Sequence, residues 1–376
     1  MTLQKAVFVT HHQHIGDGKG GVQRCTAEYL ETLEAMGLEV QIVRIRNDQR
    51  LDTKILRRLN SSPYFRPVAS TDLEHVLAAA RKADIVFLNQ VALCAVASQL
   101  KAVIGPSIPI IALSHGCEIT DLLHVARLNR QLPLSARLRP TRKQALAQVF
   151  CDEVDARAHI DGVISLSDYD AQTETWLGSA ASTWVPRTVK PDALDWSPVV
   201  GRFGFVGTLD HAPSLEGLVQ VLDECQRQGA DELEVHIVGN PPKLGEWLVQ
   251  RYRHVKYLGA LNDADMQREA STWSAFLNPI FCQARGCSTK LAMALGWQIP
   301  ILTTTIGRRG YVWEQGGVVE ANTSAEYVTT MRQLAQDSEK PLCLREGVIQ
   351  AATTAASMTA IAAAMESFCE KVAAGR

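Results

Sequence analysis

The stretch FLNPIFCQARGCSTKLAMALGWQIPILTTTIGRRGY, residues 276–311, decides the fold class of this chain. An apolar run ends at Asn278-Pro279, and the loop that follows closes with RGCSTK at 285–290. Small and apolar residues then form a helical stretch, which precedes a second apolar run at 299–302. This order of strand, loop, helix and strand puts a glycine, two hydroxyl groups and a lysine where a helix begins. Unpaired N–H groups at a helix start stabilise an anion, so the stretch predicts a phosphate-bearing ligand.

The bulk composition is that of a globular protein. The chain has 376 residues, 46% of them hydrophobic and 21% charged, with a formal net charge of −2. This length allows two or three domains, and the composition excludes a disordered chain or a dedicated nucleic-acid binder. The nine cysteines form no C-x-x-C pair, and the first residues lack the apolar core of a signal peptide. We therefore expect reduced thiols and a cytoplasmic protein.

Charge is uneven along the chain. Residues 1–190 hold 22 basic and 19 acidic side chains, whereas the remainder holds 16 and 21. The basic residues concentrate in the segments 44–66 and 127–143. One interpretation is two solvated faces. The other is contact with an anionic acceptor, with a partner protein, or with the inner face of a membrane as a peripheral protein.

Short apolar strands alternate with helical stretches through both halves of the chain. Further strands are expected at 6–10, 40–44, 85–88, 110–113, 162–166, 203–206, 233–238 and 255–258, and helices at 22–36, 214–228 and 350–374. The segment 185–202 carries three prolines and is typical of a linker. Buried strands alternating with helices predict an α/β fold with parallel sheets covered on both faces. The shared plan of the two halves predicts two Rossmann-like domains facing a cleft.

Seven motifs fall in one order along nearly the whole chain. They are GKGGVQR (18–24), ALSHGCE (112–118), DGVISLS (161–167), GFVGTLDHAPSLEGL (204–218), VHIVGNPP (235–242), VKYLGAL (255–261) and GCSTKLAMALGWQIPILTT (286–304). Together they resemble the two-domain GT-B glycosyltransferases, and in particular the retaining family 4 enzymes. The resemblance implies an N-terminal acceptor-binding domain at 1–190, a nucleotide-sugar-binding domain at 191–355, and a C-terminal helix at 356–376 that packs back on the first domain.

The resemblance also implies an activity. The protein would move a hexose from a nucleotide diphosphate sugar, UDP- or GDP-linked, to a hydroxyl of a glycan, glycolipid or protein. Transfer would proceed with retention, and the departing diphosphate would accept the proton of the acceptor hydroxyl. No metal ion and no cofactor other than the donor sugar nucleotide is implied, and no nucleic acid is expected as a partner.

Three residues of the first half are candidates for the site. The resemblance implies that the backbone at Gly20 and Gly21 approaches the donor diphosphate, and that His115 contacts the transferred sugar. The alternatives are a tight strand–helix turn and a structural turn histidine. His11, His12 and His14 share the same loop as the glycines, but adjacent loop histidines alone do not predict a metal site.

The second half supplies the remaining candidates. Arg285 and Lys290 would stabilise the leaving diphosphate and, with His115, form the catalytic set. The other expected donor-binding residues are Gly207, Thr208, Gly239, Asn240, Gly259, Ala260, Gly286, Cys287, Ser288, Thr289 and Met293.

The chain also departs from the family pattern. The family usually has an arginine where Thr208 stands, a lysine shortly after it, and two glutamates eight positions apart. Alignment on Pro300 puts Arg285 and Met293 at the glutamate positions, whereas alignment on Gly296 puts Gln283 and Leu291 there. Two alternatives therefore remain beside the transferase: a non-catalytic partner subunit of another glycosyltransferase, and a sugar-nucleotide epimerase of the same fold.

Overall fold

The computed structural model describes residues 3–16, 20–59, 62, 67–138, 143–313 and 318–375. The motif at 18–24 and the basic segments 44–66 and 127–143 lie partly outside the described residues. The chain divides into two compact units. Unit 1 consists of Met1–Thr120, Thr141–Pro186 and Ser357–Arg376, and unit 2 of Asp121–Pro140 and Arg187–Ala356.

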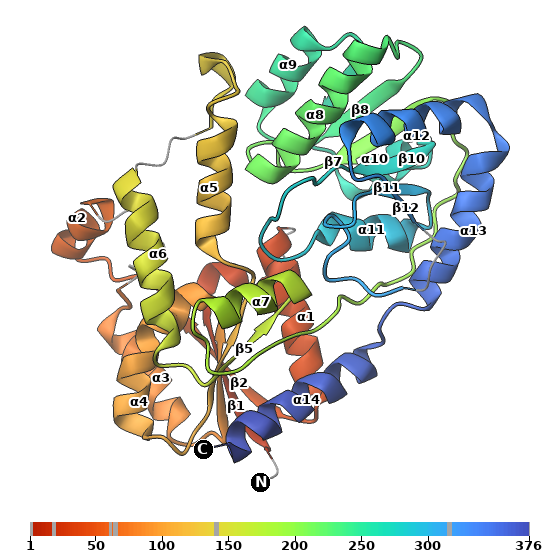
Figure 1. Ribbon diagram of the computed structural model, residues 1–376. Coiled ribbons are helices and arrows are strands. Elements are labelled where there is room, and N and C mark those ends of the chain that lie inside the picture. The colour runs from red at the N-terminus through yellow and green to blue at the C-terminus, as the bar shows by residue number, and fades with distance from the viewer. Residues whose placement is uncertain are drawn as a thin grey trace. The chain divides into compact units, whose positions relative to one another are not determined.

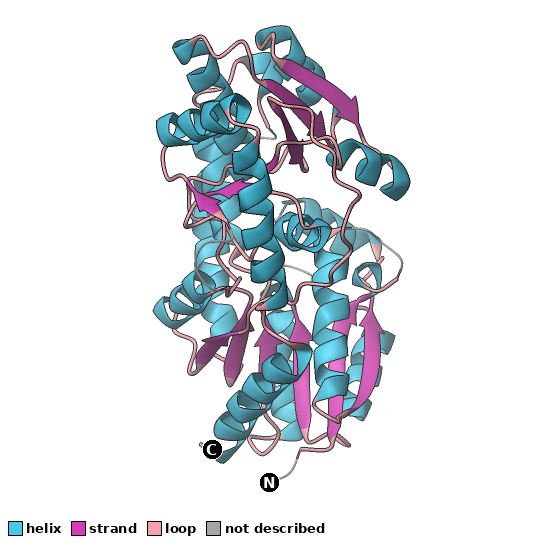
Figure 2. Cartoon of the chain, turned by 90° about the vertical axis from the view of Figure 1, so that its right-hand side faces the viewer, coloured by secondary structure: helices cyan, strands magenta, loops and turns pink. Residues whose placement is uncertain are grey.

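Unit 1 is built on a six-stranded parallel sheet with the order β2-β1-β3-β4-β5-β6. Its strands are β1 Lys5–His11, β2 Glu39–Ile45, β3 Ile85–Asn89, β4 Ile110–Leu113, β5 Gly162–Ser165 and β6 Ser182–Trp184. The central strands β3, β4 and β5 are buried along their whole length. This burial explains their nearly continuous apolar sequences, because both faces of the sheet are covered by helices (Figure 2).

The helices of unit 1 come from all three of its chain segments. They are α1 Gly21–Ala35, α2 Leu51–Leu59, α3 Ser70–Ala80, α4 Ala97–Ile104, α6 Lys143–Arg157, α7 Asp168–Trp176 and α14 Met358–Ala374, with the short helices η1 His12–His14 and η2 Val91–Val96. The last helix, α14, lies beside α1 (Figure 1). It also covers β5, since a Cβ atom at Gly162 would lie 3.0 Å from the ring of Phe368.

Unit 2 repeats this plan with a second six-stranded parallel sheet, in the order β12-β11-β10-β7-β8-β9. Its strands are β7 Arg202–Val206, β8 Glu234–Val238, β9 Val255–Gly259, β10 Ala275–Asn278, β11 Ile301–Thr303 and β12 Val319–Glu320. Its helices are α8 Ala212–Gln228, α9 Pro242–Arg251, α10 Asp263–Ala270, α11 Thr289–Trp297, α12 Ser324–Gln336, α13 Glu339–Thr353 and η3 Leu134–Ala136. Helix α5, Glu118–Leu128, belongs to this unit from Asp121 onward.

The structure confirms the predicted α/β class and the two parallel sheets. The predicted strands lie within two residues of their observed bounds, as do α1 and α8. The segment 185–201 contains no helix or strand, as expected of a linker. The predicted domains 1–190, 191–355 and 356–376 differ from the two units mainly at residues 121–140, which group with unit 2.

The C-terminal helical segment differs in one respect from the prediction. The residues expected to be helical over 350–374 are divided between two helices, because α13 ends at Thr353 and α14 starts after Ser357, close to the start of the helix predicted at 356–376. The Ser357 side chain accepts a hydrogen bond from the backbone N–H of Ala360, which caps the new helix. Among the described residues, no single helix is long and apolar enough to cross a bilayer, and only α13 and α14 taken together, across a 46° bend, meet that criterion.

The core of unit 2 includes a close contact between the sheet and an aromatic ring. Trp273 is fully buried, and a Cβ atom at Gly204 of β7 would lie 1.9 Å from its indole. Trp196 of the linker donates its indole N–H to the backbone oxygen of Trp273 at 2.7 Å, which fixes the segment around that ring. Glycine is therefore the largest residue that this packing admits at position 204.

We expect Gly204→Ala to lower the free energy of unfolding by about 1–3 kcal/mol, because the added methyl group overpacks a rigid contact. Urea denaturation followed by tryptophan fluorescence measures the change. Gly375→Ala is the matched control, since a Cβ atom there meets nothing closer than 3.4 Å. Equal stability of both variants and the wild type would contradict the packing argument.

Candidate functional site

The loop between β10 and α11 is held by the side chain of Asn278. Its Nδ2 donates to Thr303 Oγ1 at 2.9 Å and to the backbone oxygen of Gly307 at 3.1 Å. Its Oδ1 accepts a hydrogen bond from Ser288 Oγ at 3.3 Å. Ser288 is the residue before α11, and its backbone oxygen accepts from the hydroxyl of Tyr311. These contacts determine where α11 begins and therefore where its side chains point.

Lys290, the second residue of α11, reaches the carboxyl end of β7. Its ammonium nitrogen lies 5.9 Å from the ring centre of Phe205, and a Cβ atom at Gly207 would lie 2.6 Å from that nitrogen. Glycine at 207 thus leaves the space that the ammonium group occupies. Burial lowers the pKa of Lys290 to about 8. No described residue forms an ion pair or hydrogen bond with this ammonium, so its position suits an anionic ligand.

Three of the predicted glycines meet beside this lysine. Gly207 donates its N–H to the backbone oxygen of Val238 at 2.9 Å, and Gly239 donates to Gly259 at 2.8 Å. A Cβ atom at Gly239 would lie 1.7 Å from the backbone oxygen of Gly207. The carboxyl ends of β7, β8 and β9 are therefore packed backbone to backbone. Ligands of such sheets bind at this edge.

The other predicted donor residues of unit 2 differ in their surroundings. Thr208, Asn240 and Ala260 are exposed and follow β7, β8 and β9. Cys287 accepts a weak hydrogen bond from Arg187 at 3.6 Å, and Met293 packs partly buried against the apolar cluster around Trp297. Gly286 is buried in the loop, and Thr289 is the first residue of α11. Their ligand contacts stay predictions.

Arg285 has a partner that sequence reasoning missed. Its Nε lies 2.7 Å from Oδ2 of Asp121 in α5. Burial would raise the pKa of Asp121, but the hydrogen bond from His211 and the charge of Arg285 outweigh it and hold the pKa below its ordinary value. The carboxylate therefore neutralises part of the charge that Arg285 brings to the loop. No local pattern signals this pairing, because the two residues lie far apart in the sequence.

His115 is oriented by a chain of hydrogen bonds in unit 1. Asn89 Nδ2 donates to the hydroxyl oxygens of Thr10 and Thr26, each at 2.9 Å, so its Oδ1 is left as an acceptor. His115 Nε2 lies 3.0 Å from that oxygen and must carry the proton. The neutral ring consequently carries its lone pair on Nδ1. The ring of Tyr29 packs against it with the two centres 5.7 Å apart.

A fully buried ion pair supports the turn that carries His115. Arg157 of α6 and Glu174 of α7 lie 2.8 Å apart, and neither side chain is exposed. Ser114 donates to Glu174 at 3.0 Å and accepts from the N–H of Gly116 at the same distance. The turn is thus tied to two helices. Sequence reasoning missed this support as well.

Gly20 and Gly21 form the start of α1, which follows β1 at the carboxyl end of the unit 1 sheet. Gly20 precedes the first helical residue, Gly21, and both are exposed. The backbone oxygen of Gly20 accepts from the N–H of Arg24 at 3.1 Å. An exposed helix start of this kind leaves N–H groups available for an anion, as the predicted role requires.

The desolvated Lys290 leads to a stability prediction. At pH 7 the group is charged in both the folded and the unfolded chain, so the folded protein bears the full cost of its lowered pKa. We expect Lys290→Met to raise the free energy of unfolding at pH 7 by about 1–3 kcal/mol. The advantage shrinks as the pH rises from about 8 towards the ordinary lysine pKa of 10.5, because the wild-type group then loses its proton in the folded state.

Urea denaturation across this pH range measures the difference. Lys243→Met is the control, because Lys243 is exposed on α9 and its removal relieves no burial. A Lys290→Met variant that is less stable than the wild type at pH 7, or a pH-independent difference, would contradict the assignment.

The comparisons with known proteins agree with this geometry. Residues 201–337 match the family model described as "Glycosyl transferases group 1". No curated protein sequence is similar enough to the chain to count as a match.

Solved structures are similar over nearly the whole chain. Anabaena HepE in complex with UDP and glucose is 12% identical, with a TM-score of 0.62 over 97% of this chain and 98% of that one. Sucrose-phosphate synthase from Thermosynechococcus elongatus is 14% identical, with a TM-score of 0.64 over 99% and 100%. TarM is 9% identical, with a TM-score of 0.65 over 98% and 99%. At these identities the likeness shows the fold, which is GT-B. The family match and the fold together support a glycosyltransferase.

Proposed function

We propose that this protein is a retaining glycosyltransferase that moves a hexose from a UDP- or GDP-linked sugar to a hydroxyl of a glycan, glycolipid or protein, without a metal ion in the chemical step. The observation that carries the proposal is the partly buried ammonium of Lys290, which has no anionic partner among the described residues. It lies beside Gly207 at the edge of the sheet where ligands bind. The similar structure of HepE holds UDP and glucose.

The residues of unit 2 would act on the leaving group. The bond between the sugar carbon and the diphosphate oxygen breaks, and the diphosphate leaves with the electron pair. Lys290 and the N–H groups at the start of α11 stabilise the charge that develops there. Arg285 contributes a second cation, weakened by its ion pair with Asp121. The acceptor oxygen forms the new bond on the same face, and its proton passes to the departing diphosphate.

The residues of unit 1 would orient the sugar and the diphosphate. His115 is held through its Nε2–H by Asn89, which fixes the orientation of the ring that would contact the sugar. The N–H groups at Gly20 and Gly21 would approach the diphosphate. This division requires no protein carboxylate as a base, because the departing diphosphate takes the proton.

A panel of UDP-, GDP- and dTDP-sugars tests donor binding by thermal shift. We expect at least one of them to raise the melting temperature of the wild type and to lose at least tenfold in affinity with Lys290→Met, since the ammonium contacts the diphosphate. Lys243→Met should bind like the wild type. A folded protein that none of the nucleotides stabilises would overturn the proposal.

A non-catalytic partner subunit is the second candidate. The pairing of Arg285 with Asp121 and the packing of Met293 against the apolar cluster favour it, because these residues occupy the positions of the family's glutamates in one alignment. Donor hydrolysis and transfer assays with the nucleotide that binds separate the two candidates. Binding without any turnover, together with co-purification of another glycosyltransferase, identifies the partner subunit.

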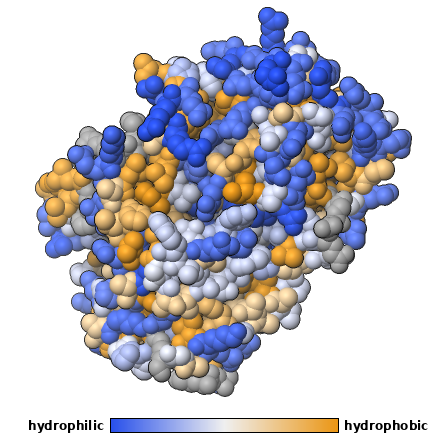
Figure 3. Space-filling model, in the orientation of Figure 1, coloured by the Kyte–Doolittle hydropathy of each residue, from blue (hydrophilic) through white to orange (hydrophobic). Residues whose placement is uncertain are grey.

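We also propose that the protein is cytoplasmic and contacts the inner face of a membrane through α2. Four apolar side chains of this helix are exposed, at 75% for Leu51, 50% for Ile55, 54% for Leu56 and 76% for Leu59. Apolar surface lies over α2 at the left edge of the molecule (Figure 3). The sequence places Lys54, Arg57 and Arg58 in the same helix. A basic helix with an exposed apolar stripe suits an anionic lipid surface.

Replacing Leu56 and Leu59 together by Asp tests this contact. We expect the double variant to bind vesicles containing anionic phospholipid at least tenfold more weakly than the wild type, because it loses apolar area and gains negative charge. Co-sedimentation measures binding. Leu342→Asp, at a half-exposed position of α13, should bind like the wild type. Equal sedimentation of wild type and double variant refutes the role of α2.

A further inference from the structure

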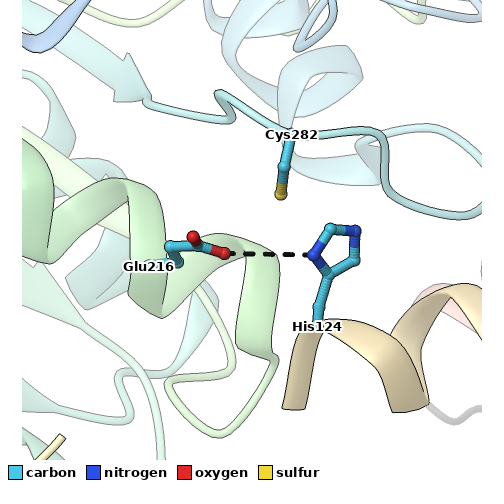
Figure 4. Close-up of side chains that lie close together, drawn as sticks. All are labelled: His124, Glu216 and Cys282. Atoms are coloured by element: carbon cyan, nitrogen blue, oxygen red, sulfur yellow. Dashed lines mark ion pairs between the residues drawn. The ribbon is translucent and has the colours of Figure 1, made fainter. Parts of the chain in front are cut away.

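Three side chains from distant parts of the sequence converge in unit 2. They are His124 of α5, Glu216 of α8 and Cys282 of the loop after β10 (Figure 4). One ligand atom of each lies within 4.8 Å of those of the other two. His124 and Glu216 are 5% and 4% exposed, and Cys282 is partly buried. Figure 4 shows the sulfur of Cys282 pointing into the space between the carboxylate and the imidazole ring.

The tautomer of the His124 ring follows from its hydrogen bond. Its Nε2 forms a hydrogen bond with the backbone oxygen of Gln283, and because a carbonyl only accepts, the proton is on Nε2. In the neutral ring Nδ1 therefore carries a lone pair, which faces Oε2 of Glu216 at 3.9 Å. This separation is too long for a hydrogen bond. Neither Nδ1 nor Oε2 has a hydrogen-bond partner among the described residues.

Two buried acceptors that face one another without a donor are costly, and a cation between them would satisfy both. The surrounding contacts suit such an ion. A histidine that binds a metal usually donates its other N–H to a carbonyl or carboxylate, as His124 does to Gln283. The second oxygen of Glu216 accepts from Arg127 at 3.0 Å, which leaves Oε2 directed at the ring.

The sulfur of Cys282 completes the set. Burial, followed by the charge of Glu216, raises the pKa of this thiol to about 11, so it is neutral when no cation is bound. A metal ion that binds a thiol displaces its proton, which passes to solvent. Thiolate, imidazole and carboxylate together are ligands typical of Zn²⁺, whereas Mg²⁺ and Ca²⁺ prefer oxygen ligands.

We propose that His124 Nδ1, Glu216 Oε2 and Cys282 Sγ form a zinc site, with water in the fourth position. The ion would join α5 and α8 to the loop that leads from β10 to Arg285 and Lys290. It would hold this loop in place and take no part in the transfer. The site is independent of the proposed transferase activity, because its ligands belong to none of the residues assigned to the donor.

The test uses the full chain, freed of metal with a chelator and titrated with Co²⁺. A thiolate bound to Co²⁺ gives a charge-transfer absorption band in the near ultraviolet. We expect this band to saturate at one ion per chain and to disappear when Zn²⁺ is added in excess. Cys282→Ser should abolish the band, and His124→Gln or Glu216→Gln should weaken Co²⁺ and Zn²⁺ binding at least tenfold. The histidine-rich loop at 11–14 contains no cysteine and cannot produce the band.

Cys343→Ser is the matched control, since Cys343 is an exposed thiol on α13. It should keep the band, the stoichiometry and the rise in melting temperature that Zn²⁺ produces in the wild type. Circular dichroism establishes that each variant is folded, and His124→Gln replaces Cys282→Ser if the latter does not fold. A wild type without the band, a band that persists in folded Cys282→Ser, or an unchanged Co²⁺ affinity in folded His124→Gln overturns the proposal.

Discussion

The buried amide of Asn278 is the constraint on which the candidate donor site depends. Its two N–H groups and its oxygen join the end of β10 to β11, to the turn at Gly307 and to Ser288 at the start of α11. A side chain with fewer donors or no acceptor would leave at least one of these partners unsatisfied. Because α11 begins where this amide places it, the ammonium of Lys290 arrives at the end of β7 beside Gly207. In unit 1 the buried ion pair of Arg157 and Glu174 likewise holds the turn at His115, because Glu174 accepts a hydrogen bond from Ser114. Both units thus fix the turn after a strand end by polar contacts of buried side chains.

Most of the fold could be predicted from the sequence because buried parallel strands have local signals. The run at 110–113, for example, is wholly buried and was predicted at its observed bounds. Strand β6 was not predicted, since it has three half-buried residues and lies at the edge of its sheet. The break between α13 and α14 was missed because the Ala-rich composition favours a helix throughout, although Ser357 is a capping residue. The prediction rested on the Ala-rich composition, whereas the N-cap at Ser357 determines where α14 begins.

Only part of the candidate site, like the fold, could be predicted from the sequence. The glycines after β7, β8 and β9 could be found from their order along the chain, and the structure brings Gly207 and Gly239 into contact beside Lys290. The ion pair of Arg285 with Asp121 could not, because it depends on where α5 packs and not on any local pattern. The same holds for the cluster of His124, Glu216 and Cys282, whose members come from three separate elements. The spacing of motifs in the sequence shows which residues follow the strands. Only the packing of the elements shows which charged side chains lie next to those residues.

The return of α14 to unit 1 has a consequence for biosynthesis. Strand β5 must wait for Phe368 to cover it at Gly162, and α1 must wait for the same helix. All of the strands and helices of unit 2 leave the ribosome before α14 does. The last element of unit 2 thus emerges before the last element of unit 1, which retains an uncovered apolar face until α14 emerges. A released truncation between α13 and α14 would leave a finished unit 2 attached to an open unit 1, the state in which this chain is most exposed to chaperones and to aggregation.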